Sequence, residues 1–60
     1  MYTIRIKRKK GSKPEELCSF EDLNDAITTF DDVCEDYYEV MVIWNNRNVI
    51  MQQLNLNLAD

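Results

Sequence analysis

The fold is decided by residues 19–39, which read SFEDLNDAITTFDDVCEDYYE. Apolar side chains recur there at spacings of three and four residues, the period of a helix with one buried face. They fall within a stripe less than about 150° wide, as expected for a helix that lies on a sheet. The stripe holds Phe20, Leu23, Ala26, Ile27, Phe30, Val33, Cys34 and Tyr37. We therefore predict one amphipathic helix over residues 20–36, with Ser19 as its N-cap.

A strand is predicted before this helix. Residues 1–7 alternate strictly between polar and apolar side chains, which is the pattern of a half-buried strand. Gly11 and Pro14 break the pattern, so residues 9–18 are predicted to form a loop that leads into the helix.

Two further strands are predicted after the helix. Residues 38–44 are rich in β-branched and aromatic side chains, which favour strands. The sequence NNRN at 45–48 predicts a hairpin turn, because Asn tolerates left-handed backbone conformations, and residues 49–56 then pair back. The expected fold class is α+β, in a single domain over residues 1–60. Its order is β-α-β-β, with one amphipathic helix packed on a three-stranded, mainly antiparallel sheet.

The chain length and its apolar runs limit the class of protein. Sixty residues suffice for one small domain with a thin core. The longest apolar run, residues 40–44, is far shorter than the roughly 20 residues of a membrane span, and Arg5 interrupts the N-terminus too early for a signal peptide. We expect a soluble, cytoplasmic protein. In a continuous helix Cys18 and Cys34 lie too far apart for a disulfide, so Cys34 is predicted in the core and Cys18 as a partly exposed thiol.

One helix can cover only one face of the predicted sheet. Because side chains alternate along a strand, Met41 and Ile43 point away from the face that holds Val40 and Val42. An uncovered apolar set usually indicates association, so a homodimer or an assembly through the sheet is one interpretation. The other is that long side chains such as Arg5 fold over this face. The sequence leaves both open.

The charges are segregated along the chain. Residues 1–13 hold six of the seven basic residues and no acid, whereas residues 14–46 hold ten of the eleven acids and no base. The net charge of −4 conceals this separation. Like charges four residues apart on a helix, such as Glu21 and Asp25, destabilise it by about 0.2–0.5 kcal/mol per pair. A predicted helix whose solvent-exposed face carries only negative charges therefore requires a functional explanation.

The spacing of these acids suggests one. Along a continuous helix, the carboxylates between residues 21 and 36 would recur every ~3.2 Å of axis, and phosphates recur every ~3.4 Å along one DNA strand. We interpret the helix as a mimic of the phosphate backbone that binds the basic DNA-binding surface of another protein. The predicted partner-binding residues are Glu21, Asp22, Asp25, Asp31, Asp32, Glu35, Asp36 and Glu39.

In its size and its acidic helix on a sheet, the chain resembles small phage-encoded DNA-mimic inhibitors of the anti-CRISPR and anti-restriction type. The resemblance covers the chain in outline and carries no diagnostic motif, so no family residue is transferred. It implies a bacterial host cytoplasm, a CRISPR effector or nuclease subunit as partner, and inhibition by occupying a DNA- or PAM-reading surface. The basic segment, Arg5 to Lys13, departs from the pattern of a pure mimic.

Other function classes stay open at this point. The sequence KRKKGSK at 7–13 has enough charge to bind nucleic-acid phosphate directly, but the overall charge of −4 argues against it. The uncovered sheet face is typical of an assembly subunit. An enzyme is the least expected class, because nothing pairs a nucleophile with a base. No cofactor or metal is expected, because no loop combines alternating oxygen ligands with a Gly.

Overall fold

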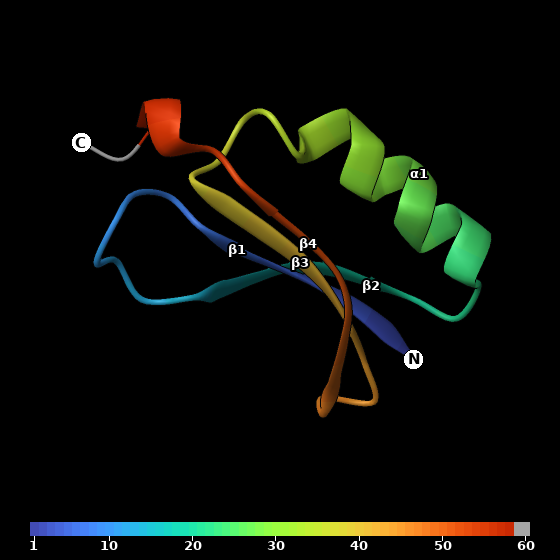
Figure 1. The fold of residues 1–60 in the computed structure, drawn as a ribbon. Helices are drawn as coiled ribbons and strands as arrows, with labels where there is room; N and C mark the ends of the chain where they lie inside the picture. Colours follow the sequence, from blue (N-terminus) through green and yellow to red (C-terminus); the bar gives the residue numbers. More distant parts are fainter. Residues whose placement is uncertain (59–60) are drawn as a thin grey trace.

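The computed structural model describes residues 1–58 and has the predicted α+β class, but with four strands instead of three (Figure 1). Its elements are β1 (Tyr2–Lys7), β2 (Glu15–Phe20), α1 (Leu23–Val33), β3 (Glu39–Trp44), β4 (Asn48–Leu54) and the short 3-10 helix η1 (Leu56–Leu58). Neighbouring strands are all antiparallel, in the order β2-β1-β3-β4. The chain order is therefore β-β-α-β-β, and the predicted β-α-β-β order is wrong.

The additional strand, β2, takes up residues 15–18 of the loop predicted over residues 9–18 and continues to Phe20. It is an edge strand, and only Cys18 and Phe20 among its side chains pack against the core. Two inward side chains are too few to produce a recognisable period. An irregularity in the β1–β2 pairing, between Ile4 and Arg5, disturbs the alternation further. The sequence pattern therefore did not distinguish this strand from a loop.

The helix α1 is shorter at both ends than the predicted span of 20–36. Its N-cap is Asp22, whose carboxylate accepts a hydrogen bond from the backbone N–H of Asn24 at 2.8 Å. Ser19, the predicted N-cap, instead lies in β2 with its Oγ 3.1 Å from Thr3 Oγ1. The helix ends where the N–H of Cys34 donates to Phe30 O at 2.8 Å. Within residues 1–58, no helix is long and apolar enough to span a membrane.

The hydrophobic core lies between α1 and one face of the sheet. Its largest fully buried side chains come from the two central strands, and Ala26 and Phe30 of α1 pack over them. These four strand residues are Ile4, Ile6, Val40 and Val42. The prediction that Ala26 and Phe30 are core residues is confirmed. Cys34 is half-buried against this core, and Cys18 is likewise half-buried.

The hairpin between β3 and β4 forms as predicted. Asn45 and Asn46 have φ angles of 52° and 61°, the left-handed conformation that a tight hairpin turn requires. The turn is fixed further by the chain start, because the N–H of Asn45 donates to Met1 O at 2.9 Å. The third predicted strand ends at Leu54 and not at residue 56, and η1 follows it.

The sheet face opposite α1 is less open than the sequence suggests. Ile43 is only 3% exposed, and its cross-strand neighbours are Thr3, which is 4% exposed, and Val49. The edge strand β4 contributes three exposed large apolar side chains, since Val49, Ile50 and Leu54 are 50%, 43% and 46% exposed. Among the described elements, α1 packs on β1, β2 and β3 but not on β4.

Candidate functional site

The carboxylates predicted to bind a partner do not all lie on the helix. Three are at exposed positions of α1, two lie in the turn before it, and two lie in the turn after it. We call this set the acidic surface, made up of Glu21, Asp22, Asp25, Asp31, Asp32, Glu35 and Asp36. All seven residues are exposed.

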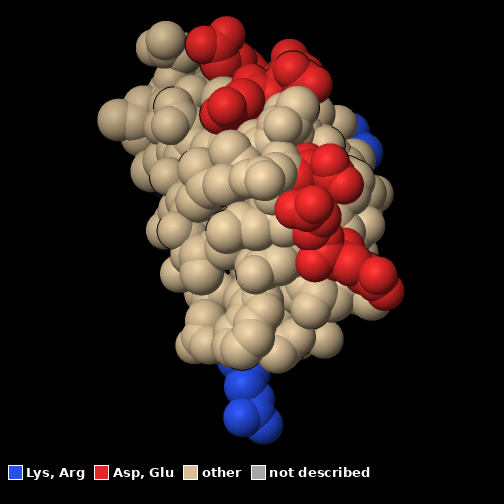
Figure 2. Space-filling model, turned by 90° about the vertical axis from the view of Figure 1, so that its right-hand side faces the viewer, with Lys and Arg blue, Asp and Glu red and all other residues tan. Residues whose placement is uncertain are grey.

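Within residues 1–58, no member of the acidic surface forms an ion pair. The two ion pairs found there are Arg8–Glu15 at 2.9 Å and Arg5–Glu16 at 3.8 Å, both between β2 and the β1 side of the hairpin. Figure 2 shows Asp and Glu side chains in two groups on this side of the molecule, one at the top and one as a column on the right. Lys and Arg appear in that view only at its margins. The acidic surface therefore has no direct ion pair with a Lys or Arg in the described part of the chain.

The regular, phosphate-like spacing predicted for these acids is not present. It assumed a helix from residue 21 to 36, whereas α1 contains only Asp25, Asp31 and Asp32 of the set. Asn24 and Thr28 occupy other exposed positions, with Thr28 Oγ1 donating to Asn24 O at 2.9 Å. In each pair of acids four residues apart, only one member lies within α1. The loss of helix stability predicted from repulsion between these pairs therefore does not apply. What the structure retains is an acidic helix with acidic turns at both ends.

The electrostatic position of these acids differs between the two ends of α1. Asp22 caps the N-terminus, where the helix dipole favours a negative charge, so this residue has a structural role. Asp31 and Asp32 lie in the last turn, which contains no basic residue. There the dipole disfavours a carboxylate, typically by about 0.3–1 kcal/mol each. The C-terminal acids therefore reduce helix stability.

Asn55 holds the acidic turn after α1 in place. Its side-chain Nδ2 donates to Cys34 O and, at 2.9 Å, to Tyr37 O, while its backbone N–H donates to Tyr38 O at 2.8 Å. The bond to Cys34 O satisfies a carbonyl group that the helix end leaves without an intrahelical partner, and the other two bonds hold the chain that follows. No local sequence pattern indicates this role, because Asn55 lies 21 residues from Cys34. Asn55 also lines a shallow pocket with Glu35, Asn57 and Leu58.

Glu39, the eighth predicted partner-binding residue, lies away from the acidic surface. It is half-buried in β3, and its neighbour Val40 points into the core beneath α1. Because adjacent strand residues point to opposite faces, Glu39 lies on the far face of the sheet. Its carboxylate accepts a hydrogen bond from Gln52 Nε2 at 2.9 Å. We therefore leave Glu39 out of the candidate surface.

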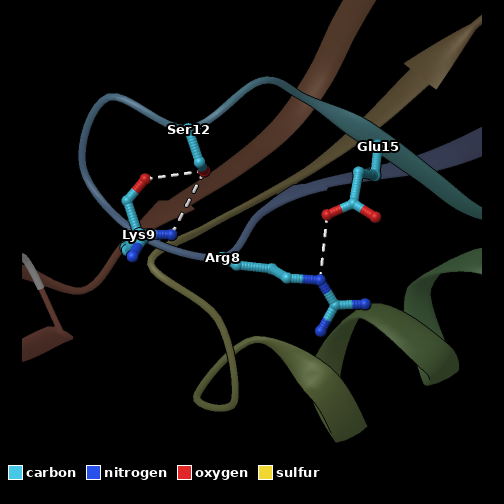
Figure 3. A network of polar contacts seen from close by, with 4 residues as sticks. All are labelled: Arg8, Lys9, Ser12 and Glu15. Atoms are coloured by element: carbon cyan, nitrogen blue, oxygen red, sulfur yellow. Dashed lines mark hydrogen bonds and ion pairs between the residues drawn. The ribbon is translucent and has the colours of Figure 1, made fainter.

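The basic segment begins in β1 and continues from Arg8 to Lys13 through the hairpin loop between β1 and β2, shown in Figure 3. Ser12 Oγ donates to Lys9 O at 2.8 Å and accepts from the Lys9 N–H at 3.2 Å, which closes the turn. Arg8 pairs with Glu15, and its guanidinium carbon lies 5.7 Å from the centre of the Tyr37 ring. Part of the basic charge is thus engaged within the fold, beside the turn that carries Glu35 and Asp36.

Cys18 is the described residue with a shifted pKa. Burial raises the pKa of its thiol above the ordinary value of 9.0, because desolvation disfavours the thiolate. A thiol with a raised pKa is a weaker nucleophile at neutral pH. Among residues 1–58, no three His, Cys, Asp or Glu side chains stand close enough to hold a metal ion. The acids are therefore distributed over a surface and are not gathered into one ligand cluster.

Comparison of the chain with models of protein families, with curated proteins and with solved structures found no match. The argument for function consequently depends on the residues and their geometry.

Proposed function

We propose that this protein is an inhibitor that binds a DNA-binding protein through its acidic surface, in place of DNA. The observation that carries the proposal is the set of seven exposed carboxylates over α1 and its flanking turns, none of which has a Lys or Arg partner within residues 1–58. Such a surface attracts a protein groove lined with Lys and Arg. Association would be fast and would weaken as salt is added.

The cost of the C-terminal acids supports a functional role. Asp31 and Asp32 oppose the helix dipole, and within residues 1–58 neither of them forms an ion pair. A stability-driven helix of this length would carry Lys or Arg in its last turn. These acids can also change without disturbing the core, because their side chains point to solvent.

The structure also supplies rigidity to both ends of the surface. Asp22 caps the start of α1, and Asn55 bonds the turn that contains Glu35 and Asp36. Side chains on ordered elements lose less conformational entropy on binding than those on a mobile tail. The partner we propose is a CRISPR effector or nuclease subunit in a bacterial host, whose DNA- or PAM-reading surface the acidic surface would occupy.

The proposal is tested by capture from bacterial lysate followed by elution with duplex DNA. We expect immobilised protein to retain a DNA-binding protein that duplex DNA releases, because the two compete for one basic surface. A matched resin carrying the D25N/D32N/E35Q variant should retain much less of it. A captured protein that binds DNA and this chain together would contradict the proposal.

The same preparation distinguishes direct nucleic-acid binding through the basic hairpin loop. Labelled duplex DNA is added to the purified chain and to a variant with Lys9, Lys10 and Lys13 changed to Gln. Our proposal predicts no DNA complex with either protein at physiological salt. A complex with the wild type that the Gln variant loses would favour the basic loop as the functional site.

A further inference from the structure

Three aromatic side chains form a row across neighbouring strands at the end of the sheet where α1 begins. Tyr2 on β1 pairs with Phe20 on β2 and with Trp44 on β3. Both ladders are regular between Tyr2 and Ile4, since the irregularity of the β1–β2 pairing lies beyond Ile4. Ile4 is fully buried in the core beneath α1. Because side chains alternate along a strand and paired residues share a face, Tyr2 and its two partners lie on the α1 face of the sheet.

The burial of this aromatic row decreases from β2 to β3. Phe20 and Tyr2 are half-buried and pack against the core, whereas Trp44 is 42% exposed. On its other side Trp44 pairs with Asn48 of β4, which is polar and exposed, and among the described elements α1 does not pack on β4. The indole of Trp44 therefore combines a fixed backbone position in the sheet with a large exposed ring.

The cations of the chain itself do not cover this indole. The cation–π contact found within residues 1–58 joins Arg8 to Tyr37, at the opposite end of the sheet. Arg47 is exposed in the turn after Trp44, and its backbone N–H donates to Trp44 O at 3.1 Å. The amino group of Met1 donates to a side-chain oxygen of the same turn at 2.9 Å. Within the described part of the chain, the exposed ring thus has no Lys or Arg stacked on it.

Trp44 lies beside the N-terminal part of the acidic surface. Glu21 and Asp22 directly follow Phe20 and precede α1, at the end of the sheet that also carries the N-terminus (Figure 1). Adjacent strands are about 4.8 Å apart, so Phe20 and Trp44 are separated by two strand spacings, roughly 10 Å. A protein–protein interface of standard size buries about 800 Å² on each partner, with about 20–30 residues a side. One interface can therefore include both these acids and the indole.

We propose that Trp44 is the anchor residue of this interface and that its indole receives an Arg side chain of the DNA-binding partner. The inference rests on the proposed function and specifies its chemistry. Carboxylates beside the ring attract a cation, and the ring face binds it through a cation–π contact. Arg fits better than Lys, because its planar guanidinium stacks on an aromatic face and also matches the geometry of a carboxylate. Trp and Arg are both enriched among the residues that dominate interface energies.

The first test uses two peptides of equal charge, octa-arginine and octa-lysine, at low salt. Trp44 is the one tryptophan of the sequence, so its fluorescence reports on this position in the unaltered protein. We expect octa-arginine to shift the emission to shorter wavelength, because a covered indole loses contact with water, and to bind more tightly than octa-lysine in titration calorimetry. Trp44→Leu keeps an apolar side chain without the ring. It should weaken octa-arginine binding about two- to fivefold, the range of an exposed cation–π contact, and octa-lysine binding less.

Three results of this first test would overturn the inference. They are equal affinities of the two peptides for the wild type, an emission that neither peptide shifts, and an octa-arginine affinity that Trp44→Leu leaves unchanged. If circular dichroism shows that Trp44→Leu is unfolded, the emission and the comparison of the two peptides on the wild type decide.

The second test uses the partner that duplex DNA releases from the resin. Trp44→Leu should weaken its binding at least about fivefold, and Trp44→Phe, which keeps an aromatic ring, should weaken it less. Leu56→Ala is the control and should bind as the wild type does, because Leu56 is 72% exposed but follows β4 at the opposite end of the sheet. Full binding by Trp44→Leu together with weak binding by D25N/D32N/E35Q would overturn this inference and leave the proposed function standing. If no captured protein is released by DNA, the proposed function fails, and the peptide measurements still decide on Trp44.

Discussion

Replacing Asn55 with Ala tests how the acidic turn after α1 is held. The side chain of Asn55 donates two hydrogen bonds across a long stretch of sequence, to Cys34 O and to Tyr37 O. Alanine removes both donors but keeps the backbone N–H that bonds Tyr38 O. The variant therefore removes the link between the end of β4 and the turn without changing the strand.

The expected loss of stability comes from the removal of two partly buried hydrogen bonds. A hydrogen bond contributes a net of about 0.5–1.5 kcal/mol, so the loss in the free energy of unfolding should be about 1–3 kcal/mol. A domain of this length has a total stability of only about 3–9 kcal/mol. At about 4–8 °C per kcal/mol, Tm should fall by about 4–24 °C.

Thermal unfolding followed by circular dichroism measures this effect. Asn57→Ala is the matched control, because Asn57 is an exposed Asn in the same segment and its change should shift stability by less than about 0.5 kcal/mol. Amide exchange at Asp36, whose N–H bonds Val33 O, should also quicken in Asn55→Ala. Equal Tm values for Asn55→Ala and Asn57→Ala would refute this account of the turn.

The remaining predictions concern the core, the helix start and the thiol. Phe30→Ala should lower the free energy of unfolding by about 3–5 kcal/mol through a cavity at a side chain that is 6% exposed, and a Tm within 2 °C of wild type would contradict this. Asp22→Ala should cost about 0.5–2 kcal/mol in urea unfolding through loss of the N-cap bond, whereas Asp22→Asn should cost less. Cys18 should react with iodoacetamide more slowly in the folded protein than in urea at pH 8, because burial raises its pKa, and equal rates would contradict that. Since the folded thiol binds its proton more tightly than the unfolded one, this group should reduce stability as pH rises above about 9.

The parts of the fold that the sequence predicted are those with a strong local period. The apolar stripe of residues 23–33 identified α1 and its buried Phe30, and the Asn45–Asn46 pair identified the hairpin turn. β2 was missed because an edge strand needs only two inward side chains, and Glu15 and Glu16 gave it the composition of a loop. The start of the helix was misplaced because Phe20, an apolar residue at helical spacing, belongs to β2.

For the candidate site, the sequence predicted which acids are exposed but not how they are arranged in space. Helical spacing identified Asp25 and Asp32 as outward-pointing, and both are exposed. Glu39 was wrongly grouped with them, because its face depends on strand alternation around Val40 and not on its nearness in sequence. Asn55 gave no local signal, since its bonds join residues far apart in the chain.

The central claim is that the position of the carboxylates, and not the net charge of the chain, determines partner binding. Two triple variants separate these quantities, because each removes three negative charges and brings the net charge from −4 to −1. D25N/D32N/E35Q neutralises the acidic surface, whereas E15Q/E16Q/E39Q neutralises acids on β2 and on the far face of the sheet.

The decisive measurement is the affinity of these two variants and the wild type for the partner that DNA releases, at a low and a high salt concentration. We expect D25N/D32N/E35Q to bind about tenfold more weakly at low salt, a loss of about 1.4 kcal/mol, and to show a shallower salt dependence. E15Q/E16Q/E39Q should retain the affinity and the salt dependence of the wild type. Equal weakening of both variants, or unchanged binding by D25N/D32N/E35Q, would contradict the claim.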